Sequence, residues 1–301
     1  MQSNQLVTGV RNPVLWGYGL GVLGILCFSV TLPVTKLGVS EVDSTLFGLG
    51  RSVVVSIPAL LTLIYLRAAI PSFSQAKKLL LVALGVVVGF PWLSAMAMET
   101  VDGAQAGIVI AVLPLFTALA GAVIARQCPS IGFWAMAILG CCLVIAFVWD
   151  SHQNGLSKGD LLLLLASLVC AIGYAVGAEL SKELGGMVVI CWAVVLSVPF
   201  SLVLIIPLVP DQDFELSWQI WSSFLYVAFV SQWLAFVFWY KGLALGGVVR
   251  VSQVQLLQPF FTLVVAVILL GEEVDSTTFW FVSAVVMAVG VGGKMKVSRR
   301  L

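Results

Sequence analysis

Residues 104–124 read AQAGIVIAVLPLFTALAGAVI, an apolar run without a charged residue and with one proline near its middle, Pro114. The hydrocarbon core of a bilayer is about 30 Å thick, so a helix needs about 20 apolar residues to cross it. This run has the length and the composition of a transmembrane helix.

The rest of the chain has the same character. Of its 301 residues, 61% are hydrophobic and 10% are charged, whereas an ordinary soluble domain has about 25% charged residues. Runs that are long enough to span a bilayer begin near Leu15, Leu46, Leu79, Ala104, Ile131, Leu161, Met187, Trp218, Val251 and Thr277. We therefore predict an all-α membrane protein of ten transmembrane helices, with no room for a separate soluble domain.

Positive charges divide unevenly between the loops on the two sides of the predicted bundle. One side holds Arg11, Arg67, Lys77, Lys78, Arg126, Lys182, Lys241, Arg250, Lys294, Lys296, Arg299 and Arg300. The other side holds Lys36, Arg51 and Lys158. Because cytoplasmic segments are enriched in Lys and Arg, we expect both termini in the cytoplasm.

Several functions are excluded by what the apolar runs lack. The six cysteines lie mostly inside these runs without Cys-x-x-Cys spacing, and His152, the one histidine, lies in the polar segment 150–159. No carboxylate pair at bilayer depth, histidine cluster or Ser-His-Asp set is present, and acid-base or metal chemistry needs such groups. We therefore expect no enzyme activity, metal or cofactor, and a net charge of +1 gives no sign of nucleic-acid binding.

The chain contains an internal repeat. A shift of 145 residues brings Pro114-Leu115-Phe116-Thr117 onto Pro259-Phe260-Phe261-Thr262, and Lys36 falls on Lys182 at nearly the same shift. Two halves of five helices follow, residues 14–150 and 158–294. An odd number of spans per half makes the second copy enter from the opposite side, and such inverted repeats build many secondary transporters.

The motifs within these halves resemble a known family. Gly24 to Leu37 followed by Arg51, the run around Leu113-Pro114-Leu115, and Tyr240-Lys241-Gly242 with Leu270-Gly271-Glu272 are similar to the EamA-type repeat of the drug/metabolite transporter superfamily. The resemblance implies ten helices in two inverted repeats, a central cavity and export of amino acids or related metabolites. An aromatic amino acid exporter is the nearest likeness.

Two features depart from the pattern of that superfamily. Its small multidrug members couple to protons through a carboxylate in the first span, but residues 15–34 contain no Asp or Glu. In addition, Arg126-Gln127 stands in the first half where the second half has Gly271-Glu272.

The ninth predicted span carries polar residues on one face. Ser252, Gln255, Pro259 and Thr262 are spaced by three, four and three residues, and Gln258 lies beside them. Amides are costly to expose to lipid, so they should face other helices or a cavity. Substrate binding in a cavity and hydrogen bonding between helices are both compatible with this pattern.

Prolines and aromatic residues supply further candidates. Pro114 and Pro259 each leave a carbonyl four residues earlier without its helical donor, so we interpret them as hinges of broken helices or as plain packing kinks. Trp92, Tyr174, Trp239 and Tyr240 lie on helices that line the cavity in the family, and are candidates for stacking on a substrate or for packing. Arg51, inside the second span, either reaches the surface or holds backbone carbonyls within the bundle.

The sequence thus predicts a secondary transporter that exports amino acids or similar small amphipathic metabolites by alternating access. The alternatives are an exchanger of phosphorylated metabolites or nucleotide sugars, which needs several buried cations, and a membrane scaffold or sensor without transport. We expect a multi-pass protein of a bacterial inner membrane whose partners are the lipid bilayer and a small solute; a monomer is compatible with the sequence.

Overall fold

The computed structural model is a bundle of helices. It describes residues 13–124, 127–151, 157–212, 214–293, 295 and 297–299. The first half contains α1 (Pro13–Ser29), α2 (Thr31–Gly38), α3 (Ser44–Tyr65), α4 (Phe73–Val82), α5 (Phe90–Met98), α6 (Gly103–Ile110), α7 (Leu113–Ile124) and α8 (Ile131–Ser151). The second contains α9 (Lys158–Leu184), α10 (Gly186–Ile205), α11 (Trp218–Leu225), α12 (Ala235–Gly246), α13 (Val248–Val251), α14 (Gln258–Leu270) and α15 (Ser276–Gly293).

Irregular helical turns connect several of these helices. The segments Ala83–Gly89 and Tyr226–Leu234 are π-helical and join α4 to α5 and α11 to α12. The segments Ile206–Asp211 and Ser252–Leu257 are 3₁₀-helical. A pair of short antiparallel strands, β1 (Gln127–Pro129) and β2 (Val297–Arg299), adds a small element that the prediction of an all-α chain did not include.

Seven segments of the described chain are long and apolar enough to cross a membrane. They are Pro13–Gly38, Ser44–Tyr65, Phe73–Met98, Gly103–Ile124, Lys158–Leu184, Gly186–Asp211 and Trp218–Gly246. Two apolar helices are shorter, Val254–Leu270 and Ser276–Ala288. The multi-pass helical class is therefore confirmed, but the prediction of ten spans is matched by seven clear ones. The first part of the ninth predicted span is wound as a 3₁₀ helix.

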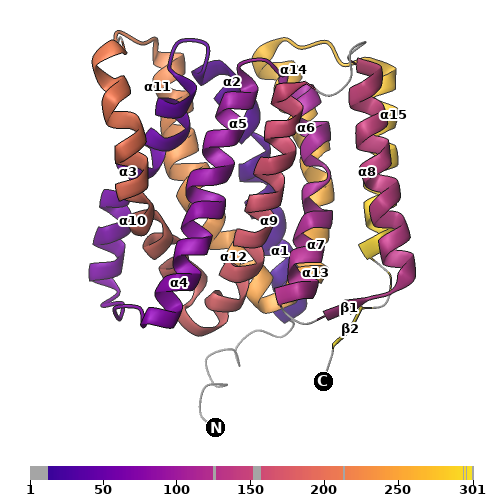
Figure 1. The fold of residues 1–301 in the computed structure, drawn as a ribbon, viewed down its shortest axis with the longest axis horizontal. Coiled ribbons are helices and arrows are strands. Elements are labelled where there is room, and N and C mark those ends of the chain that lie inside the picture. The colour runs from indigo at the N-terminus through magenta and orange to yellow at the C-terminus, as the bar shows by residue number, and fades with distance from the viewer. Residues whose placement is uncertain are drawn as a thin grey trace.

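The long helices run side by side between the two ends of the bundle (Figure 1). The closest pairings join α1 to α12, α3 to α10, α8 to α15, and α9 to both α5 and α7. In Figure 1, α8 and α15 form one edge of the molecule, and the start of α1 lies at the same lower end as β2. Each of these pairs joins one half of the sequence to the other, so neither half forms a separate core.

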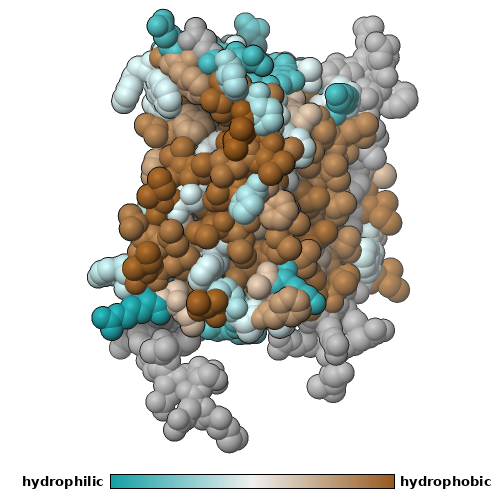
Figure 2. Space-filling view, turned by 60° about the vertical axis from the view of Figure 1, so that its left-hand side comes forward, coloured by the Kyte–Doolittle hydropathy of each residue, from teal (hydrophilic) through white to brown (hydrophobic). Residues whose placement is uncertain are grey.

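The outer surface is apolar around the middle of the bundle. Figure 2 shows a broad hydrophobic band between two hydrophilic ends. Ile57, Val203, Ile268 and Trp280 are each more than 60% exposed, although they sit in regular helices. A surface of this kind is stable against lipid tails rather than against water.

The ends of the helices carry ordinary capping groups. The Asp43 side chain accepts hydrogen bonds from the backbone N–H groups of Thr45 and Leu46 at the start of α3. Ser72 and Ser157 form capping boxes at α4 and α9. Gly271 ends α14 in the left-handed conformation, with φ of 65°, which glycine adopts without steric cost.

Candidate substrate-binding site

A narrow pocket lies inside the bundle where the two halves meet. Its lining comes from helices of both halves: Phe28, Thr31, Leu32, Arg51, Val86, Phe90, Leu113, Tyr174, Ser231, Gln232, Phe236 and Gln258. Among the residues whose side chains the structure describes, none from α8, α10 or α15 belongs to this lining. The pocket therefore draws on the helices around the centre of the bundle.

The polar part of the lining consists of buried donors and hydroxyls. Arg51, Gln232 and Gln258 are 3%, 1% and 8% exposed. The hydroxyl groups of Thr31 and Ser231 are hydrogen-bonded to each other at 2.8 Å, which links α2 to the π-helical segment before α12. The described part of the lining contains no Asp or Glu.

The apolar part of the lining is an aromatic wall. The rings of Phe28 and Phe236 meet edge to face, with their centroids 4.9 Å apart, and Tyr174 lies 5.9 Å from Phe236. Such pairs have the edge and offset geometries that aromatic rings prefer. The pocket thus places an aromatic surface beside a cluster of hydrogen-bond donors, which is the common composition of a small-molecule site.

The polar face predicted for the ninth span is buried, but it is divided between two roles. Gln258 lines the pocket, whereas the Thr262 hydroxyl donates to the carbonyl of Ser29 at 3.1 Å and ties α14 to α1. Gln255 is buried outside the pocket lining, and neither atom of its amide has a hydrogen-bond partner. Ser252 is fully buried in the same 3₁₀ segment as Gln255.

The four predicted aromatic residues lie at different distances from the pocket. Tyr174 lines it, and Trp239 packs behind Tyr174, with ring centroids 5.4 Å apart. Tyr240 is fully buried, and its hydroxyl points to the carbonyl of Gly173 at 3.4 Å. Trp92 lies away from the lining and donates to the hydroxyl of Thr45 at 3.1 Å, joining α5 to α3.

Both predicted hinge prolines lie next to interruptions of their helices. Residues 111–112 separate α6 from α7 just before Pro114, and the 3₁₀ segment precedes Pro259. One detail of the prediction is wrong: the carbonyl of Gln255, which should lose its donor, accepts from the backbone N–H of Gln258. The tighter 3₁₀ pattern supplies a donor three residues later in place of the missing one.

The two π-helical segments also face the pocket. Val86 belongs to the first, and Ser231 and Gln232 belong to the second. A π-helical turn widens the helix by one residue and is frequent at functional sites. In this chain the wider turn of the second segment accompanies two polar side chains that line the pocket.

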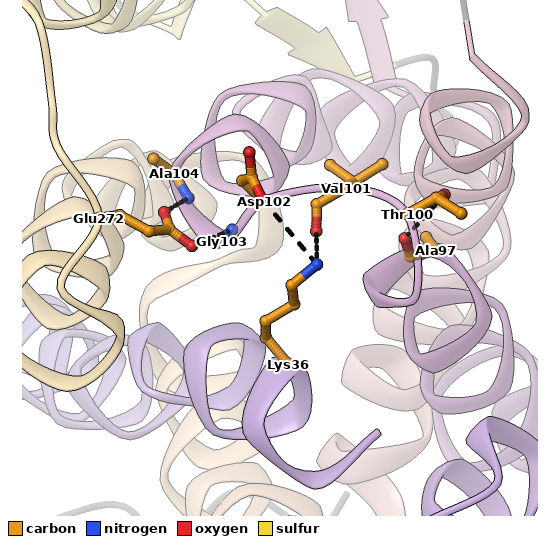
Figure 3. Close-up of polar contacts among 8 residues, drawn as sticks. All are labelled: Lys36, Ala97, Thr100, Val101, Asp102, Gly103, Ala104 and Glu272. Carbon is orange, nitrogen blue, oxygen red and sulfur yellow. Dashed lines mark hydrogen bonds and ion pairs between the residues drawn. The ribbon is translucent and has the colours of Figure 1, made fainter. Parts of the chain in front are cut away.

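One end of the bundle is held by polar contacts between its helices (Figure 3). Lys36 Nζ at the end of α2 donates to the carbonyl of Val101 at 2.9 Å and lies 3.9 Å from Asp102 Oδ1. The carboxylate of Glu272 accepts from the backbone N–H groups of Gly103 and Ala104, both at 2.7 Å. We call this group the Glu272 clamp; it fixes the start of α6 to the loop after α14, where a carboxylate also meets the positive end of the helix dipole.

A second, larger pocket is wholly apolar. It offers about 700 Å³ of space that is partly open to the outside, against about 390 Å³ for the central one. It lies among α3, α11 and the end of α10, with Leu46, Phe47 and Trp221 in its lining. No polar atom is exposed in it. Because a solute site needs a few polar groups for orientation, the central pocket is the better candidate.

Sequence reasoning missed part of the pocket. Gln232 and Ser231 stand within the apolar run of the eighth predicted span, where a polar residue is itself a sign of a functional site. The sequence singles out Arg51, but only as a residue that reaches the surface or binds backbone carbonyls. Thr31, Phe28 and Phe236 carry no signal that separates them from ordinary packing residues.

Comparison with known proteins identifies the class. The model of the EamA-like transporter family matches residues 15–149 and 157–292. The chain therefore belongs to the EamA-like transporter family, within the drug/metabolite transporter superfamily. The family resemblance predicted from the sequence is confirmed.

Two individual proteins extend the comparison. The uncharacterized transporter YdeK of Bacillus subtilis (strain 168) is 39% identical over 273 residues, which cover 91% of this chain and 94% of YdeK. A solved crystal structure that is 14% identical matches with a TM-score of 0.66 over 92% of this chain and 96% of its own. At that identity the second likeness concerns the fold alone.

Proposed function

We propose that the protein is a secondary transporter that exports amino acids, aromatic ones included, or similar small amphipathic metabolites by alternating access. The observation that carries this proposal is the central pocket, in which the aromatic wall of Phe28, Tyr174 and Phe236 stands beside buried donors from Arg51, Gln232 and Gln258. An amphipathic solute needs this pairing of surfaces. Membership of a transporter family supports it.

We also propose ten spans arranged as two inverted five-helix repeats, residues 14–150 and 158–294. In such a repeat α1 corresponds to α9, α5 to α12, α3 to α10 and α8 to α15. The pairing of α1 with α12 then corresponds to the pairing of α9 with α5, and α3–α10 and α8–α15 are each a pairing of two corresponding helices. The π-helical segments and the interruptions before Pro114 and Pro259 also occur at corresponding places in the two halves. The shorter helices α14 and α15, with α8, then complete the set of ten.

Alternating access requires that each end of the pocket can close. The Glu272 clamp holds α6 and α14 together at one end. At the other end α1 and α12 touch through glycines: a Cβ added to Gly17 would lie 2.8 Å from the backbone of Gly246. We propose that the two ends open in turn, with Pro114 and Pro259 as hinges.

The orientation belongs to the same proposal. We propose a bacterial inner-membrane protein with both termini in the cytoplasm, because Lys and Arg residues are more frequent on that side of the predicted bundle. The Glu272 clamp would then face away from the cytoplasm. The start of α1 and strand β2 lie together at the opposite end of Figure 1.

The alternative substrates are less well supported. A phosphorylated metabolite carries two negative charges near neutral pH and needs several cations, but Arg51 is the single cation among the described residues that line the pocket. A scaffold or sensor would need no passage between the ends. Both alternatives give distinct results in the experiment that follows.

Purified protein in proteoliposomes tests the proposal. Vesicles preloaded with unlabelled L-phenylalanine should accumulate external labelled L-phenylalanine by saturable counterflow, and a panel of the other amino acids should compete to different extents. Protein-free vesicles are the control. Competition by phosphate esters alone would favour the exchanger, and zero flux for the whole panel, with ligand binding retained, would favour a scaffold or sensor.

A further inference from the structure

Arg51 is a buried cation that the described chain leaves unpaired. Its side chain is 3% exposed and lies within α3, seven residues after Ser44 at the start of this helix. Its Nε–H has no hydrogen-bond partner, and the ion pairs found in the described part of the chain join Lys36 to Asp102 and Lys182 to Glu179 instead. An isolated charge in a low-dielectric interior costs several kcal/mol by general estimates, so this arrangement calls for a compensating anion.

A second unpaired donor lies on the same pocket. Nε2 of Gln232 has no hydrogen-bond partner although the residue is 1% exposed. Arg51 and Gln232 come from opposite halves of the chain, and both line the pocket together with the hydroxyl pair of Thr31 and Ser231. The pocket therefore offers unused N–H donors and one positive charge, and no carboxylate lies among the described residues of its lining.

We propose that Arg51 and Gln232 form the subsite for a carboxylate of the transported solute, whose apolar part lies against Phe28, Tyr174 and Phe236. The inference rests on the proposed transport function and narrows it to solutes with a carboxylate beside an apolar group. A guanidinium matches a carboxylate with two parallel hydrogen bonds. One buried cation balances one carboxylate, whereas a phosphate ester would leave excess negative charge.

A role for Arg51 in packing alone makes a different prediction. If the side chain only filled space between α3 and its neighbours, its replacement would lower stability and leave ligand preference unchanged. Discrimination between a charged ligand and its neutral isostere therefore separates the two roles. Amide and carboxylate ligands of the same shape provide this comparison.

Thermal unfolding of the purified full-length protein tests the subsite with 3-phenylpropionate and 3-phenylpropanamide, which differ in charge but hardly in shape. The wild type should bind the carboxylate at least tenfold more tightly, because hydrogen bonds to charged groups contribute on the order of tenfold to a hundredfold in affinity. In Arg51→Gln this preference should fall to about twofold or less. Arg67→Gln removes an exposed arginine at the end of α3 and should keep the full preference.

Further variants and probes complete the test. Gln232→Leu removes an unpaired donor from an apolar neighbourhood, so it should fold even if Arg51→Gln does not, and its carboxylate preference should fall about threefold to tenfold. Equal responses of the wild type to both probes, unchanged preference in both pocket variants, or tighter binding of phenyl phosphate than of 3-phenylpropionate would overturn the subsite. Counterflow of L-phenylalanine is measured separately. Its absence alongside an intact carboxylate preference would contradict the proposed transport and leave the subsite standing.

Discussion

Gln255 and Gln258 illustrate how far apart two similar residues of one helix can be in their surroundings. The sequence places both beside Pro259, and on that basis both are predicted to contact a substrate. In the structure only Gln258 is part of the pocket lining, whereas the amide of Gln255 is buried without a partner elsewhere. The turn of 3₁₀ helix between them changes the angle at which each side chain leaves the backbone.

Substitution of these two glutamines should therefore have unequal effects. Gln258→Ala should weaken the apparent affinity for L-phenylalanine threefold to tenfold, because loss of one neutral hydrogen bond costs about 0.5–1.5 kcal/mol, and its melting temperature should change little. Gln255→Leu should keep the affinity and match or exceed the wild-type melting temperature, since it removes an unsatisfied buried amide. The half-saturation concentration of counterflow measures the apparent affinity, and thermal unfolding measures the melting temperature. Reduced stability with normal affinity in Gln258→Ala would mean that this residue holds helices together.

For single residues, the sequence predicts which polar side chains are buried better than it predicts which residues they contact. Hydropathy and spacing correctly indicate that Ser252, Gln255, Gln258 and Thr262 avoid lipid, because all four are buried. They do not reveal that Arg51 and Gln232 share a pocket, since the two residues are 181 positions apart (232 − 51) and meet only through the packing of the two halves. Spacing within one helix carries no information about such contacts.

At the scale of helices, the Glu272 clamp is present in one half and has no charged counterpart in the other. Glu272 binds two backbone N–H groups at the start of α6, whereas Gln127 stands at the matching position of the first half. A neutral amide interacts more weakly with a helix N-terminus than a carboxylate does. We therefore expect the clamped end to be the more stably closed one.

Glu272→Gln should loosen the clamped end. A helix-capping group contributes about 1 kcal/mol, which corresponds to roughly a fivefold shift between closed and open states. A cysteine at the pocket position Thr31 should accordingly react about fivefold faster with a polar maleimide in this variant. Glu273→Gln makes the same change at the next residue, which is exposed, and should leave the rate at its original value; equal rates in the two variants would remove the clamp from the mechanism.

The contact between α9 and α12 depends on the absence of a side chain at Gly177. A Cβ added there would lie 2.4 Å from the ring of Tyr240, which is fully buried. Gly177→Ala should therefore cost about 1–3 kcal/mol of stability through overpacking. Gly19→Ala, where nothing lies within 4 Å of the added Cβ, is the matched control; thermal unfolding that shows equal stability for both variants would contradict this packing.

At the scale of the whole molecule, hydropathy predicts the class and most of the helices, but the number of clear spans less well. Seven segments of the described chain satisfy the criteria for length and apolarity, and the backbone of the ninth predicted span changes from 3₁₀ to α-helical geometry before Pro259. Local winding depends on neighbours that a single sequence does not specify. The arrangement of α1 against α12 and of α3 against α10 is likewise a property of the folded molecule.

The orientation of the whole molecule can be tested with two matched cysteines. Ser40 and Ser74 are both exposed, the first between α2 and α3 and the second near the start of α4, so they lie at opposite ends of the same bundle. In intact cells an impermeant maleimide should label Ser40→Cys and spare Ser74→Cys until the membrane is opened. The unmodified protein gives the background from its native cysteines. Labelling of Ser74→Cys alone would reverse the proposed orientation.

The energy source of transport is a property of the whole molecule. Glu99 is exposed at the end of α5, and Glu179 pairs with Lys182 near the end of α9. The one fully buried carboxylate among the described residues, Asp160, is held by Ser157 and Gln105 at the start of α9. A proton-coupled site needs a carboxylate that can reach the pocket, and none of these three lines it.

The variant Glu99→Gln/Glu179→Gln should therefore keep most of the wild-type flux of L-phenylalanine in proteoliposomes, and a pH gradient imposed across the membrane should not drive accumulation in either protein. Loss of flux in a variant that still folds and inserts, or pH-driven accumulation by the wild type, would restore a role for protons.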